Sequence, residues 1–195
     1  MKQLLFIALN LAFGLGLASV PFSSNAAPPD SGTAHLLFVG SWEGTSTLYR
    51  PRDTTRDIRV ETVRAVCDST LKGTYVRCQS RWTREDGQYR DLNIYWNYNA
   101  HDSLYDILFL YDDWPGKVNY PLTYDAENRE FTGVDTFTTP KGVAARERVS
   151  WTISADGNTI VGTEHNHFAT DPPDYWPMSF KFIWHRVAAP GVGGE

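Results

Sequence analysis

The sequence is poor in cysteine and has no basic clusters, and both shortages narrow its possible functions. Only two cysteines, Cys67 and Cys78, occur in 195 residues, so the Cys-x-x-Cys-His motif of covalent haem attachment is absent. Lysine and arginine total 18 against 23 aspartate and glutamate residues, a formal net charge of −5. The sequence also has no block of basic residues, so we predict no nucleic-acid partner.

A helical repeat of apolar residues is also missing, because no window sustains one over three turns. Short stretches rich in β-branched and aromatic residues recur instead, separated by turn residues such as Lys72-Gly73 and Asp156-Gly157. A meander of eight to ten such strands closes into a barrel, which removes its edges. We therefore expect an all-β, antiparallel up-and-down barrel. Its strands are predicted near residues 40–49, 56–70, 74–84, 88–98, 104–111, 118–124, 130–138, 145–154, 159–168 and 178–187.

The first residues have the order of a secretory signal. Lys2 supplies a positive charge, Leu4 to Val20 form an apolar run, and Ser24-Asn25-Ala26 offers the small residues that signal peptidase reads. We predict a signal peptide over residues 1–26 and an exported protein, periplasmic or secreted, without a membrane span after cleavage. The alternative is an uncleaved anchor, although the run is shorter than the roughly 20 apolar residues of a spanning helix.

The rest of the chain divides into one domain and two tails. Residues 27–34 and 188–195 are small and rich in Pro and Gly, which predicts disorder. Residues 35–187 have the length of one domain, entered through a short helical segment at 35–39. The connection at 169–177 is rich in Pro and aromatic residues, so we expect a rim or lid at a barrel mouth.

Aromatic residues are abundant, with seven Trp, ten Tyr and ten Phe. Ordinary Leu, Ile and Val can fill the core of a domain of this size, so the excess of rings indicates aromatic-lined walls. The alternative explanation is the strand propensity of aromatic residues.

The two cysteines are spaced for a bridge between neighbouring strands. If the chain turns at Lys72-Gly73, Leu71 lies opposite Thr74, and the same register sets Cys67 opposite Cys78. Paired antiparallel residues have Cα atoms about 5.5 Å apart, a distance that a disulfide accepts. We predict a Cys67–Cys78 disulfide, as expected in an oxidising compartment.

Three segments carry a resemblance to lipocalin-like (calycin) barrels. Phe38 to Gly44 resembles their Gly-x-Trp opening, and Phe182 to Arg186 resembles the aromatic-x-Arg ending. With Leu71 to Tyr75 between them, the chain is similar to a bacterial exported lipocalin-like domain family of unknown function. The resemblance implies that Arg186 packs across Trp42 to close the barrel floor, and that a small apolar or aromatic ligand lies inside.

His165 and His167 share one face of their strand, and the preceding turn decides which face. If the turn has two residues, Trp151 pairs with Gly162 and both histidines lie on the face opposite Trp151. If it has three residues, Trp151 pairs with Val161 and the histidines share its face, toward the interior.

We prefer the three-residue turn, because it sets Arg148 opposite Glu164 as a cross-strand ion pair. Glu147 then pairs with His165 inside the barrel, and a carboxylate beside an imidazole is one way to make a general acid or base. Buried polar pairs are more often structural or line a ligand pocket. Two histidines still lack a third ligand, so we predict no metal site.

The leading hypothesis is an exported envelope protein that binds a small apolar or aromatic molecule inside its barrel, without a cofactor. One alternative is an enzyme of isomerase, cyclase or hydratase type using Glu147 and His165. Another is a structural or interaction protein whose barrel is filled by its own rings. The predicted cavity wall consists of Trp96, Tyr98, Phe109, Tyr111, Phe137, Trp151, His165 and Phe180.

Overall fold

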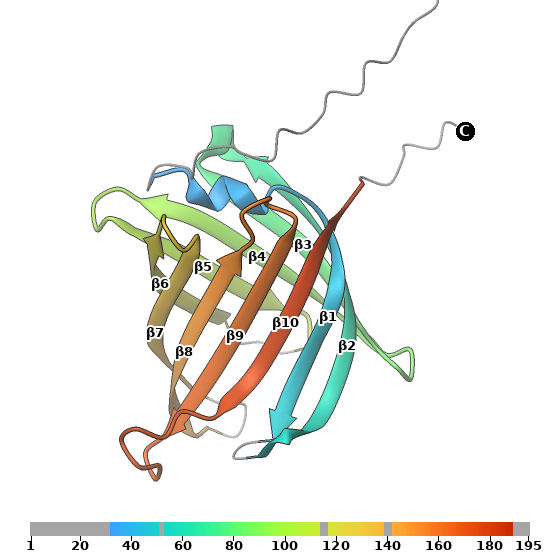
Figure 1. Ribbon diagram of the computed structural model, residues 1–195, viewed down its shortest axis with the longest axis vertical. Helices are drawn as coiled ribbons and strands as arrows, with labels where there is room; N and C mark the ends of the chain where they lie inside the picture. Colours follow the sequence, from blue (N-terminus) through green and yellow to red (C-terminus); the bar gives the residue numbers. More distant parts are fainter. Residues whose placement is uncertain (1–31, 51–52, 114–116, 139–141, 189–195) are drawn as a thin grey trace, which may run out of the picture.

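The computed structural model describes residues 32–50, 53–113, 117–138 and 142–188, which form a closed barrel of ten antiparallel strands (Figure 1). Each strand pairs with its neighbours in the chain, and β1 closes the ring against β10. The strands are β1 (Gly40–Arg50), β2 (Asp53–Thr70), β3 (Tyr75–Arg84), β4 (Tyr89–Asn99), β5 (Leu104–Tyr111), β6 (Lys117–Asp125), β7 (Glu130–Thr138), β8 (Ala144–Ile153), β9 (Thr159–Phe168) and β10 (Met178–Val187). The predicted fold class and all ten predicted strands are confirmed.

The predicted signal peptide at 1–26 lies outside the described residues, as do most of the predicted leader and tail. Within the described part of the chain, no helix has the length and apolar character needed to cross a bilayer.

Alternation along each strand separates the inside of the barrel from the outside. In β8, for example, Ala145, Glu147, Val149, Trp151 and Ile153 are buried, while the residues between them are exposed or half-buried. This period of two follows from the pleat of a strand, which points successive side chains to opposite faces. Strand parity therefore shows which side chains enter the barrel.

One end of the barrel is closed by the short 3-10 helix η1 (Ala34–Phe38), seen at the top of Figure 1. Phe38 is fully buried and its ring stacks on Trp96, with 4.1 Å between centroids. The backbone N–H of Ala34 donates to the Tyr105 hydroxyl at 3.0 Å. We call this end, with η1 and the rings beneath it, the closed end.

The Trp42–Arg186 pair fastens η1 to the first and last strands. The guanidinium carbon of Arg186 lies 4.3 Å from the centre of the Trp42 ring. Arg186 also donates to the carbonyl oxygens of Leu37 at 3.0 Å and Val39 at 2.6 Å. The Trp42 indole N–H donates to the carbonyl of Phe38 at 2.7 Å. The pair thus joins η1 to β1 and β10 at the closed end.

The disulfide prediction is confirmed. Cys67 on β2 lies directly opposite Cys78 on β3, and their sulfur atoms are bonded. The turn between the strands is the 3-10 segment η2 (Leu71–Gly73). Its residues have positive φ, and Gly73, at φ 88°, needs a conformation that only glycine adopts without a steric penalty.

The preferred register of the β8–β9 hairpin is wrong. Trp151 pairs with Gly162, which is the register of the two-residue turn, although the loop itself spans residues 155–158. Gly162 faces the interior, where a Cβ atom would overlap the ring of Phe182. The three-residue register would place Val161 at that inward position, so packing against Phe182 excludes it. The side chain of Asp156 stabilises the wider loop by accepting the Asn158 N–H at 3.0 Å.

Candidate functional site

The end of the barrel opposite η1 is hollow. A deeper cavity of about 120 Å³ and a mouth cavity of about 410 Å³ adjoin each other there. We call the two together the open-end chamber. Six residues line both cavities: Leu48, Arg59, Arg90, Tyr111, Glu164 and Phe180. The chamber thus combines rings with charged groups inside the barrel.

Five of the eight predicted wall residues line this chamber. They are Phe109, Tyr111, Phe137, Trp151 and Phe180. Trp96 and Tyr98 lie elsewhere, because Trp96 is fully buried among the rings of the closed end and Tyr98 packs 5.0 Å from the ring of Tyr105. Participation of the five in ligand binding stays a prediction.

The expected interior position of His165 is wrong, as the register requires. His165 pairs with Arg148 on the outer face, and its Nδ1 lies 3.0 Å from the carbonyl oxygen of Trp176. His167 is also outside, with its ring 5.0 Å from Trp176. The Glu147–His165 pair therefore does not form, and the acid–base mechanism built on it loses its geometric basis.

At Trp176, the connection between β9 and β10 does not cover the open-end chamber as the expected lid would. That ring lies against the outer wall, with the guanidinium carbon of Arg148 at 4.5 Å and that of Arg146 at 5.3 Å. Cation–π contacts of this kind keep the indole on the strands rather than over the chamber.

Inside the barrel, Glu147 has a different partner. Glu164, shifted inward by the same register, hydrogen-bonds Glu147, and the Tyr120 hydroxyl donates to Glu147. Burial raises the pKa of the Glu147 carboxyl, and burial together with the charge of Glu147 raises the pKa of Glu164 well above its ordinary value. Two carboxyl groups this close hold a shared proton, since both cannot ionise together at low cost.

Opposite this pair stands a cluster of arginines around one buried carboxylate. Glu61 has a side chain only 2% exposed, and it lies 2.9 Å from Arg90, 3.3 Å from Arg59 and 3.7 Å from Arg84. Ser46 donates a further, longer hydrogen bond to Glu61 at 3.4 Å. Burial and the nearby charge of Arg90 lower the pKa of the Arg59 guanidinium. Three cations thus share a single carboxylate.

Sequence reasoning missed this cluster, although a signal was present. Once Cys67 is placed on the inner face, the period of two puts Val63, Glu61 and Arg59 on that face as well. A charged residue at the end of an apolar inward series is unusual, because charges are rarely buried without a partner.

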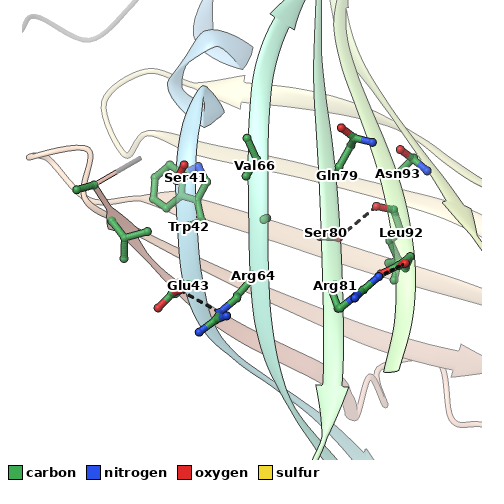
Figure 2. A pocket seen from close by; sticks show the side chains of 14 residues that line it. Ser41, Trp42, Glu43, Arg64, Val66, Gln79, Ser80, Arg81, Leu92 and Asn93 are labelled. Carbon is green, nitrogen blue, oxygen red and sulfur yellow. Dashed lines mark hydrogen bonds and ion pairs between the residues drawn. The ribbon is translucent and has the colours of Figure 1, made fainter. Parts of the chain in front are cut away.

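A larger hollow, of about 860 Å³, lies over the outer face of β1 to β4 (Figure 2). Its charged residues form two ion pairs, Glu43–Arg64 at 3.1 Å and Arg81–Asp91 at 2.8 Å, and all four side chains are at least 42% exposed. Solvent screens such pairs and hydrates their surface. We therefore place the candidate site in the smaller, ring-lined chamber rather than here.

Within the described ranges, no group of three or more His, Cys, Asp or Glu side chains is placed to hold a metal ion.

No protein-family model and no curated protein matches the chain. Among solved structures, Rv2717c from M. tuberculosis is similar at 14% identity and TM-score 0.59, over 82% of this chain and 98% of that one. At that identity the likeness shows the fold alone.

Two weaker similarities carry no argument. One is to EF1p2_mFAP2b bound to DFHBI, at 12% identity and TM-score 0.41, over 80% of this chain and 98% of that one. The other is to a DUF3598 family protein from Nostoc punctiforme, at 8% identity and TM-score 0.27, over 82% and 100%. The ten-strand barrel itself is consistent with a lipocalin-like (calycin) fold.

Proposed function

We propose that this is an exported envelope protein that binds a small apolar or aromatic molecule in the open-end chamber. The observation that carries the proposal is the contrast inside one barrel. The closed end is packed with the protein's own rings, whereas the other half leaves a ring-lined cavity with charged groups in its wall. Concave apolar sites with a few polar groups are typical of small-molecule binding.

The chamber walls offer flat surfaces for an aromatic ligand. The rings of Trp82 and Phe180 stack with centroids 5.5 Å apart, and Trp151 meets Phe182 edge-on at 4.5 Å. Rings held in this way present faces and edges to a guest at little entropic cost. A ligand that spans the deeper cavity contacts several of them at once.

Export and family membership belong to the same proposal. The signal-like order of residues 1–26 supports export, and so does the Cys67–Cys78 bridge, because disulfides persist in oxidising compartments. The packing of Arg186 on Trp42 supports membership of the lipocalin-like superfamily, in its bacterial exported branch. The intact mass of protein recovered from the periplasm or medium tests cleavage before Ala27.

The binding test uses intrinsic tryptophan fluorescence. Aromatic dyes and acids should quench it saturably, and Trp151→Phe and Trp82→Phe should each reduce the quench because these rings line the deeper cavity. Trp176→Phe is the matched control, since Trp176 lies against the outer wall beside Arg148. Flat titrations over a broad set of ligands, with no small molecule bound in native mass spectra of the exported protein, would contradict the proposal.

A second candidate function is acid–base catalysis in the same chamber. The carboxyl pair of Glu147 and Glu164 favours it, because one shared proton lets one carboxyl donate while the other accepts. This pair replaces the expected Glu147–His165 pair in an isomerase, cyclase or hydratase reaction. If it is correct, Glu164→Gln should keep ligand binding and abolish conversion of bound ligand, as followed by mass spectrometry. Bound ligands that all return unchanged from the wild type would favour simple binding.

A further inference from the structure

The charges around the open-end chamber are unevenly distributed, and their distribution bears on the ligand. Three guanidinium groups, from Arg59, Arg84 and Arg90, contact one carboxylate, Glu61. The carboxyl pair across the chamber retains a proton, so it contributes less than its two formal negative charges. Buried charges in proteins are normally paired, because an uncompensated one is costly. Of these guanidinium groups, Arg59 and Arg90 line the chamber, so its positive charge is concentrated on the wall that they form.

Two of the arginines are held in position at the wall. The guanidinium carbon of Arg90 lies 4.9 Å from the Trp82 ring centre and 5.8 Å from that of Tyr111. Arg59 lines both cavities, and its side chain is 25% exposed. The Nε atom of Arg90 has no hydrogen-bond acceptor among the described residues. Glu61 Oε1 also has no hydrogen-bond donor among the described residues, so the cluster is held in place but keeps unused hydrogen-bonding groups.

We propose, on the basis of the function proposed above, that the ligand is a small aromatic or apolar carboxylic acid in its ionised form. Arg59 and Arg90 hold its carboxylate, and its apolar body lies against Trp82, Trp151 and Phe180. Guanidinium–carboxylate hydrogen bonds are the strong, charge-assisted kind, and the planar fork of arginine matches a carboxylate.

The opposite wall tolerates this anion. Because Glu147 and Glu164 share a proton, their charge toward the chamber is reduced. Burial also raises the pKa of the Tyr111 and Tyr120 hydroxyls, so both remain neutral at physiological pH. The rim residue Asp113 is the remaining acidic group in the chamber lining. An anion therefore meets two cations on one side and, on the other, a carboxyl pair of reduced charge beside neutral hydroxyls.

The test compares acids with neutral amides of the same shape. The mature protein is titrated with naphthalene-2-carboxylate and naphthalene-2-carboxamide, and with the acid and amide of 3-phenylpropanoic and decanoic acid, by calorimetry and tryptophan fluorescence at pH 7.5. We expect each acid that binds to do so at least about tenfold more tightly than its amide, the effect of one charge-assisted hydrogen bond.

Two variants locate the preference. Arg59→Gln should reduce the acid-to-amide ratio to about threefold or less, whereas Glu61→Gln, which removes the shared carboxylate, should raise it. Because Glu61→Gln is expected to change the acid-to-amide ratio in the opposite direction, the test remains decisive if Arg59→Gln does not fold. Arg148→Gln is the matched control, because it removes the same charge from the outer wall and should leave the ratio unchanged.

The outcomes separate the two proposals. Acids and amides that bind saturably and equally would overturn the carboxylate inference and leave the binding function standing. Silence from all three pairs would overturn the carboxylate inference, and silence from the broad ligand set and the native mass spectra as well would overturn both. A preference that survives Arg59→Gln but is lost in Arg148→Gln would also overturn the inference, because it would place the anion on the outer face.

Discussion

The two halves of the barrel are built from the same strands but differ in the side chains that fill them. At the closed end, Phe38, Trp96 and Phe131 form a ring cluster with centroids 4.1 to 5.6 Å apart. At the open end, inward-facing positions of the strands are occupied by Glu61 and Glu164 as well as by rings. Apolar burial stabilises a fold, whereas buried charge costs free energy. The comparison assigns stability to the closed half and binding to the open half.

The largest effect should come from the closed end. Trp42→Ala removes a fully buried ring and the face on which Arg186 rests, so we expect a loss of about 3–5 kcal/mol in the free energy of unfolding. Urea titration measures it. Trp176→Ala, on the outer wall, is the matched control and should cost about 1 kcal/mol or less. Equal losses in both variants would break the assignment of stability to the closed half.

The disulfide should have the next largest effect. The double variant Cys67→Ala, Cys78→Ala releases a loop with a sequence separation of 11 residues, and we expect a loss of about 2–3 kcal/mol. The comparison is made in urea, oxidised wild type against the double variant. Because reduced wild type should match the variant, a reduced protein as stable as the oxidised one would contradict the prediction.

The open end should respond in the opposite direction. Since the pKa of Glu164 is raised above its ordinary value of 4.5, the folded chain keeps a proton that the unfolded chain releases above that pH. The free energy of unfolding then falls as pH rises from about 4.5 toward the raised pKa. Glu164 faces Glu147, Tyr120 and Arg90. The Glu164→Gln substitution removes the titrating carboxyl and therefore this dependence of stability on pH.

We therefore expect Glu164→Gln to be more stable than wild type at pH 8, on the order of 1 kcal/mol, with a difference that shrinks toward pH 5. Urea midpoints at the two pH values measure it. Glu43→Gln, on the exposed outer face, is the control and should shift neither midpoint appreciably. A Glu164→Gln variant less stable at pH 8 than at pH 5, relative to wild type, would contradict the raised pKa.

The smallest effect concerns the outer wall. His165→Ala should leave the affinity for chamber ligands within about twofold of wild type, because its ring contacts the Trp176 carbonyl outside the barrel. Fluorescence titration with the dye that Trp151→Phe affects provides the measurement. A strong loss of affinity would indicate a binding site on the outer wall and would contradict the assignment of binding to the open half.

Local sequence patterns were sufficient to predict the strands and the disulfide. Alternating apolar residues and turn signals predicted ten strands, and the Lys72-Gly73 turn predicted the partner of Cys67. Both depend on interactions between residues close in the chain, where the pleat and the turn impose the geometry.

The β8–β9 hairpin shows where such reasoning fails. The sequence favours the three-residue register through one cross-strand ion pair, Arg148 with Glu164, and such a pair contributes little at a surface. The observed register places Gly162 beside the ring of Phe182, where a larger side chain would clash. A one-residue slip reversed the faces of His165 and Glu164, and with them the chemistry of the interior.

The sequence by itself thus determined the barrel, its strands and its disulfide, since these follow from strand periodicity and turn geometry. Only the tertiary structure decided that Glu164 rather than His165 accompanies Glu147, and that Arg59, Arg84 and Arg90 gather on Glu61. Which charges meet inside a closed barrel depends on packing between strands distant in the chain, where contacts such as that of Phe182 with Gly162 outweigh a single ion pair.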